Sequence, residues 1–143
     1  MKKVLFVLTV LLIVGVFLTG CSAKLLKESD VSFAGPMVEN VLIAHNEGNY
    51  DMWAKDMSEE MLKAVPKDKF NEMFKTVTDK IGNYIPNSKT FLAAEESGGK
   101  IIVQYMAKFT DEDQVKLTFS FKDVNGKKKI VGEFYDSQKL RGK

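Results

Sequence analysis

His45 is the only histidine of the sequence, and a free imidazole changes its charge between about pH 5 and pH 8. It lies seven residues after Val38 among apolar residues at helical spacing, so both would face the same side of a helix. From there His45 could act as a general acid or base inside a cavity. The alternative is a side chain at a helix end that bonds to a carbonyl group or to water. One histidine without a fixed partner is no catalytic site, so the sequence favours this alternative.

Acidic residues 111–113 form a contiguous Asp-Glu-Asp run that could suggest a hard cation. Calcium loops, however, alternate their oxygen ligands with spacer residues and a glycine. We therefore interpret the run as a solvated loop and expect no metal site. The sequence also has no phosphate loop, no nucleophile elbow and no Cys/His metal spacing, so we expect no cofactor.

The N-terminus carries the sequence pattern of an exported protein. Lys2 and Lys3 precede the uncharged stretch 4–18, which is followed by Leu-Thr-Gly-Cys at 18–21. A charged start, a short apolar stretch and small residues before a cleavage site predict a signal peptide over 1–20. Leu-Thr-Gly-Cys resembles the lipobox of bacterial lipoproteins, which implies a lipid on Cys21 and cleavage before it. The alternative is an uncleaved anchor helix in which the cysteine is incidental.

Cys21 is the only cysteine, so it cannot form a disulfide within the chain. A diacylglyceryl anchor would give the thiol a role, because two acyl chains hold a protein on a membrane durably. The sequence thus predicts a partner, the membrane, reached through the lipid anchor. The expected location is the extracytoplasmic face of the cell membrane.

Charge and length limit what the mature protein can be. The first 20 residues hold two lysines and no acid, which leaves 19 basic and 19 acidic residues in the remainder. A balanced chain lacks the surplus of Lys and Arg that a nucleic acid requires, so we expect no nucleic-acid partner. The remaining length is that of one ordinary domain. We expect a lipidated tether over 21–32 and a single domain over 33–143.

The first half of this domain has the period of helices. Apolar residues from Val38 to His45 share one helix face, with Pro36 in the first turn and Gly48 as a stop signal. Asn49 and Ser58 each suit the cap of a short helix. A longer helix follows Pro66, with apolar residues at 70, 74, 77 and 81.

After Gly82 the period changes to two, and β-branched and aromatic residues become frequent. We expect four strands, at 90–95, 101–109, 115–122 and 130–135, with Asn125-Gly126 as a tight hairpin turn. Helices followed by an antiparallel meander predict the α+β class. The expected core consists of Val41, Leu42, Trp53, Phe70, Phe74, Val77, Ile81, Val103, Tyr105, Leu117, Phe119 and Phe134.

The order of these elements resembles the DUF3887 group of small secreted and lipid-anchored proteins over roughly 36–137. The stretches that carry the resemblance are Glu-Gly-Asn-Tyr-Asp at 47–51, Met-Ser-Glu-Glu-Met at 57–61, Ile-Gly at 81–82 and Ile-Val-Gly-Glu-Phe-Tyr at 130–135. That group is similar to the NTF2-like (cystatin-like) superfamily. The resemblance implies an NTF2-like cone, with N-terminal helices packed on a curved four-stranded antiparallel sheet.

Enzymes of that superfamily work with Asp, His or Tyr side chains that point into the cone. By this resemblance the catalytic candidates are His45, Tyr105 and Glu95, within a wider set that also holds Tyr84, Tyr135 and Glu133. No spacing in the sequence ties any two of them together.

We therefore expect a non-catalytic envelope lipoprotein that binds a small apolar ligand or an envelope protein through the cone. If the cone is filled, the polar sheet face at 116, 118, 120 and 122 would be the partner surface instead. The alternative function is a lyase, isomerase or hydrolase that uses a cavity His or Tyr with a carboxylate.

Overall fold

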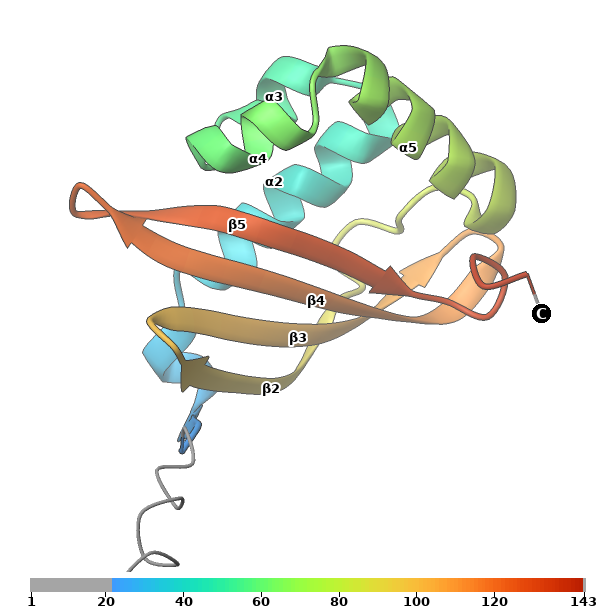
Figure 1. The fold of residues 1–143 in the computed structure, drawn as a ribbon. Helices are drawn as coiled ribbons and strands as arrows, with labels where there is room; N and C mark the ends of the chain where they lie inside the picture. Colours follow the sequence, from blue (N-terminus) through green and yellow to red (C-terminus); the bar gives the residue numbers. More distant parts are fainter. Residues whose placement is uncertain (1–21, 143) are drawn as a thin grey trace, which may run out of the picture.

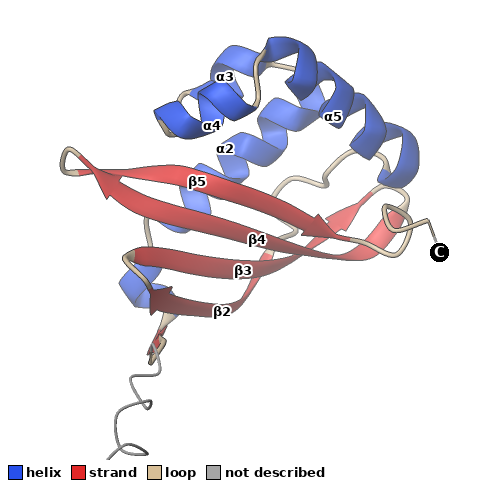
Figure 2. Cartoon of the chain, viewed as in Figure 1, coloured by secondary structure: helices blue, strands red, loops and turns tan. Residues whose placement is uncertain are grey.

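The computed structural model describes residues 22–142, in which helices cover one face of an antiparallel sheet (Figures 1 and 2). The expected signal peptide and Cys21 lie outside the described residues. The α+β class is confirmed. The helical elements are the 3₁₀ helix η2 (Glu28–Val31), α2 (Ala34–Glu47), α3 (Tyr50–Ala54), α4 (Glu59–Ala64) and α5 (Lys67–Ile81).

The sheet has five strands and not the predicted four. Its order follows the sequence, and neighbouring strands are antiparallel. The strands are β1 (Lys24–Leu26), β2 (Thr90–Ser97), β3 (Lys100–Phe109), β4 (Glu112–Val124) and β5 (Lys127–Asp136). The additional strand, β1, lies in the segment predicted to be a tether, where Lys24 pairs with Glu96 and Leu26 with Ala94. Three residues are too short to show an alternating pattern, which is why sequence periodicity missed β1.

The helix caps and the hairpin turn lie at the residues that the sequence predicts. The side chains of Asn49 and Ser58 accept hydrogen bonds from Met52 and Met61, and so cap α3 and α4. Gly48 ends α2 in the left-handed region, with φ of 61°. Asn125 and Gly126 both have positive φ, as a tight hairpin between twisted strands requires.

The core lies between the helices and the inner face of the sheet. Nine of the twelve residues expected there are buried. Phe74 and Val77 are half-buried, and Phe134 is 63% exposed, so the expectation for these three was wrong. Phe74 and Val77 both lie on α5, which stands at the margin of the sheet beside β5 (Figure 1), and Val77 lines an open pocket there.

Phe134 faces outward because of a β-bulge in β5. Phe121 pairs with Ile130, whereas the neighbouring Ser120 pairs with Gly132, so β5 contains one extra residue at that point. Since side chains alternate along a strand, one extra residue exchanges the two faces for the remainder of β5. Ile130 is buried on the inner face. Beyond the bulge, Glu133 and Tyr135 are the residues that face inward.

No helix between residues 22 and 142 is both long enough and apolar enough to cross a membrane. Among residues 22–142, the helices α2 to α5 lie on one side of the sheet and leave its outer face uncovered (Figure 2).

We expect Phe119→Ala to lower the free energy of unfolding by about 3–5 kcal/mol, because the ring is fully buried and its loss leaves a cavity. Phe134→Ala is the matched control and should change it by less than about 1 kcal/mol. Urea unfolding followed by circular dichroism measures both values. Equal losses in the two variants would contradict the assignment of faces.

Candidate functional site

A pocket of about 400 Å³ opens between α5 and β5. Its walls come from three elements: one residue of α2, one face of α5 and the end of β5. The lining residues are His45, Glu72, Met73, Thr76, Val77, Glu133, Phe134 and Tyr135. A hollow of this size with mostly apolar walls and a few polar groups is typical of a small-molecule site.

Glu133 and His45 meet at the buried side of this pocket. Nε2 of His45 lies 3.6 Å from Oε1 of Glu133, and the two side chains are only 6% and 4% exposed. This separation is within the range of an ion pair but too long for a hydrogen bond. The indole Nε1 of Trp53 donates a hydrogen bond of 3.1 Å to the same oxygen. The second oxygen of Glu133 has no hydrogen-bond partner among the described residues.

Tyr135 is the third polar group of the pocket. Its ring lies 5.7 Å from the ring of His45, edge to face. Burial, and then the negative charge of Glu133, raise the pKa of Tyr135 well above its ordinary value, so the phenol stays protonated. Its buried hydroxyl, like both ring nitrogens of His45, has no hydrogen-bond partner within residues 22–142.

Four buried polar atoms without a partner in one place are unusual, because most such atoms in folded proteins are hydrogen-bonded. Together they offer one carboxylate acceptor, one phenol donor and an imidazole that can accept or donate. The site can therefore bind a polar group that enters between apolar walls. It also holds the groups that a proton transfer would need.

Each of these side chains is held in place by residues near it in the sequence or in the fold. His45 is in the last turn of α2, which Gly48 terminates, and Phe70 of α5 lies against its ring at a centroid distance of 5.3 Å. Trp53 is fixed by burial in the short helix α3 that Asn49 caps. Glu133 and Tyr135 reach the inner face only because of the bulge before Gly132.

Tyr105 and Glu95 do not join this site, so the structure does not bring the three catalytic candidates together. Tyr105 is buried on the inner face of β3, where burial raises its pKa to about 12, but it lies outside the pocket. Glu95 pairs with Ile102 on β3 and lines a separate shallow hollow on the outer face. A β-bulge between Phe91 and Ala93 determines the face that Glu95 takes. Strand periodicity gives alternation but not the position of a bulge, so the sequence alone left the face of Glu95 open.

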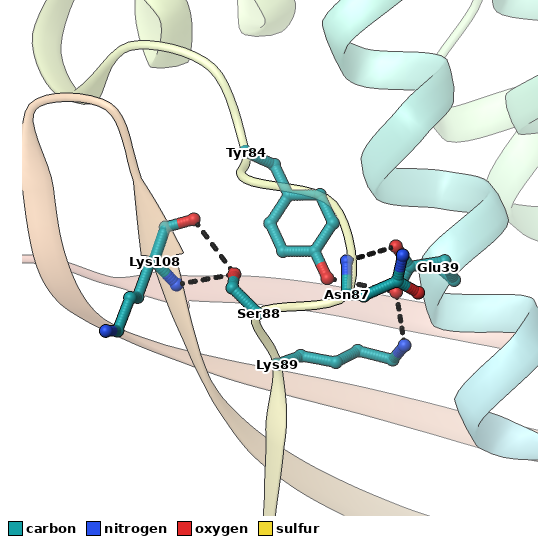
Figure 3. Close-up of polar contacts among 6 residues, drawn as sticks. All are labelled: Glu39, Tyr84, Asn87, Ser88, Lys89 and Lys108. Atoms are coloured by element: carbon teal, nitrogen blue, oxygen red, sulfur yellow. Dashed lines mark hydrogen bonds and ion pairs between the residues drawn. The ribbon is translucent and has the colours of Figure 1, made fainter.

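Tyr84 belongs to a different polar cluster, which Figure 3 shows. Its hydroxyl donates to Glu39 at 2.9 Å, and Glu39 also accepts from the backbone of Asn87 and pairs with Lys89. Burial would raise the pKa of Glu39, but these hydrogen bonds together hold it below its usual value. Burial and the bond to Glu39 raise the pKa of Tyr84 to about 12. Because the cluster is satisfied internally, we assign it to fastening the loop before β2 onto α2.

The central residue of the acidic run at 111–113, Glu112, also has a structural role. Glu112 accepts hydrogen bonds from the hydroxyl of Ser137 and from the backbone of Gln138 and Lys139. It therefore holds the C-terminal turn against the start of β4 and does not lie in a solvated loop as expected. Within residues 22–142, no three His, Cys, Asp or Glu side chains gather closely enough to hold a metal ion.

The sequence named His45, Glu133 and Tyr135 as chemistry-bearing residues but did not place them together. One signal could have done so. Gly132 interrupts an apolar strand, and a glycine inside a strand often marks a bulge. A bulge there turns Glu133 and Tyr135 toward the helix that carries His45.

Comparison with known proteins gives one match. A family model described as "Protein of unknown function (DUF3887)" matches residues 38–132, from α2 into β5. No curated protein and no solved structure matches the chain. The resemblance to DUF3887 is thus confirmed, whereas the likeness to the NTF2-like superfamily and the lipoprotein assignment stay predictions.

We expect Tyr135→Phe to raise the free energy of unfolding by about 1 kcal/mol, because it removes a buried hydroxyl that has no partner. Tyr84→Phe is the matched control and should lower it by about 1 kcal/mol, since that hydroxyl donates to Glu39. Urea unfolding at neutral pH measures both. If Tyr135→Phe destabilises the protein as much as the control does, the hydroxyl of Tyr135 makes a stabilising hydrogen bond in the folded protein, which contradicts the assignment.

Proposed function

We propose that this chain, which belongs to the DUF3887 family, is a lipid-anchored envelope protein that binds a small molecule in the pocket between α5 and β5. The observation that carries the proposal is the set of buried, unpartnered polar atoms of His45, Glu133 and Tyr135 at a pocket with apolar walls. Leaving such atoms without a partner costs stability, so the fold alone gives no reason to keep them there.

The size of the pocket favours a small molecule over a protein partner. Its volume of about 400 Å³ falls within the range of ligand sites, about 300–1,000 Å³. Met73 and Val77 of α5 line one side of it and Tyr135 of β5 lines another, which gives an apolar ligand body two walls to contact. A protein partner would need a broad surface, and the polar atoms lie too deep for one to reach them all.

The arrangement of helices and sheet supports an NTF2-like fold as part of this proposal. A long helix, α5, stands beside a twisted sheet (Figure 1). Aromatic side chains are buried on the inner face of the sheet, and residues of both α5 and β5 line the pocket. This is the place where a cone of that superfamily would have its mouth.

The lipid anchor rests on the sequence around Cys21. A basic start, an apolar stretch and Leu-Thr-Gly before the only cysteine support lipidation at this residue and exposure on the extracytoplasmic face. In the structure the first described strand begins at Lys24, so that a lipidated Cys21 would leave a complete domain outside the membrane.

A second candidate function is acid–base catalysis, and the closeness of His45 and Glu133 favours it. A carboxylate beside an imidazole can orient the ring, which would then accept a proton from a substrate. Tyr135, kept protonated by burial, would donate a hydrogen bond to the oxygen on which charge develops. We rank this below binding because the 3.6 Å separation is longer than a hydrogen bond and, within residues 22–142, no further polar side chain orients the histidine.

We expect Cys21→Ser to abolish incorporation of a fatty-acid label and to leave the protein at its unprocessed size, because the thiol is the lipid acceptor. Ser22→Ala is the control and should behave as the wild type. Labelling in cells followed by gel electrophoresis measures both. A Cys21→Ser protein that is still labelled and of processed size would contradict the anchor.

We expect native mass spectrometry of the protein purified from cells to show a retained small molecule. Thr76→Trp should remove it, because Thr76 lies at the exposed rim of the pocket and an indole there would fill the entrance. Lys75→Trp is the matched control, since Lys75 is exposed on the same helix but does not line the pocket. Equal retention in both variants would show that the molecule binds elsewhere.

A further inference from the structure

We infer that the pocket between α5 and β5 selects organic cations, specifically a primary or secondary ammonium group on a small apolar body. This inference rests on the proposed function, that the pocket binds a small molecule. It goes further by naming the charge and the chemical class of that molecule.

The charges around the pocket favour a cation. Among the described residues, its lining contains the carboxylates Glu72 and Glu133 and the imidazole of His45, but no lysine or arginine. An anionic ligand would therefore meet two carboxylates without a compensating permanent positive charge. A cation would instead supply an opposite charge to Glu133, whose side chain is 4% exposed and is poorly screened by water.

The hydrogen-bonding atoms match an ammonium group. Trp53 already occupies Oε1 of Glu133, and Oε2 is free. A neutral imidazole has one nitrogen that accepts, and the oxygen of Tyr135 can accept as well. A primary ammonium has three donors and no acceptor, so these three groups could satisfy all of them.

The aromatic walls favour a cation for an independent reason. Tyr135 lines the pocket with its ring on the inner side of the sheet, and a positive charge over an aromatic face is attracted by the electrons of the ring. Met73 and Val77 on the opposite wall have no polar atoms that would need to be desolvated, so they suit the apolar body of the ligand. A neutral alcohol would use the same walls but would leave the charge of Glu133 unpaired.

The single tryptophan gives a direct readout. Trp53 is the only tryptophan of the chain, and its indole donates to the carboxylate that the ammonium would contact. Binding at Glu133 should therefore change the fluorescence of Trp53. The full chain in phosphatidylcholine vesicles is titrated at neutral pH with hexylammonium, hexanol and hexanoate, whose apolar chains differ by at most one carbon. Empty vesicles serve as the blank.

We expect hexylammonium to bind about tenfold more tightly than hexanol, since a charge-assisted hydrogen bond is stronger than a neutral one. Hexanoate should cause no change. Glu133→Gln keeps an oxygen for Trp53 but removes the charge, so hexylammonium and hexanol should then bind equally. Glu59→Gln is the matched control on the exposed first turn of α4 and should retain the full preference.

Three results would overturn the inference: hexanol binding as tightly as hexylammonium, a preference that survives Glu133→Gln, or no response to hexylammonium. None of these contradicts the proposed function by itself. A retained molecule that Thr76→Trp removes would still show a binding pocket. If no molecule is retained but the protein responds selectively to hexylammonium, the proposed cation site is still supported.

Discussion

One extra residue in β5 determines which side chains meet the helices, and the candidate site depends on it. Before the bulge Ile130 contributes to the core, and after it Glu133 and Tyr135 take the inner face while Phe134 turns to solvent. Without the bulge, alternation from Ile130 would place Gly132 and Phe134 inward. The interior at that end of the sheet would then be apolar, and His45 would face a phenyl ring instead of a carboxylate.

Two carboxylates of this protein, one half-buried and one buried, show how a structural role differs from a binding role. Glu39 receives hydrogen bonds from Tyr84 and the loop before β2 and pairs with Lys89, so both of its oxygens are engaged (Figure 3). The side chain of Glu133 is more deeply buried but receives only one hydrogen bond from the residues that the structure describes, that of Trp53. The first arrangement is complete within the fold, whereas the second leaves an oxygen directed at the pocket.

Much of the fold follows from local sequence, and the site follows from it only in part. Helix caps and tight turns depend on a few neighbouring residues, so they can be predicted from the sequence. Examples are the caps Asn49 and Ser58 and the turn at Asn125-Gly126. The faces that Glu95 and Phe134 take depend on bulges, which are defined by pairing with another strand. The meeting of His45 with Glu133 joins residues 88 positions apart, and no local pattern encodes such a contact.

The position of β1 limits how far the domain can move from whatever holds Cys21. Only two residues separate Cys21 from Lys24, so the first strand lies within about 11 Å of that cysteine even with the chain fully extended. β1 and β5 are the opposite edges of a five-stranded sheet, about 19 Å apart at ordinary strand spacing. An acyl chain on Cys21 would thus keep β1 near the bilayer, whereas β5 and the pocket beside it belong to the opposite edge of the sheet.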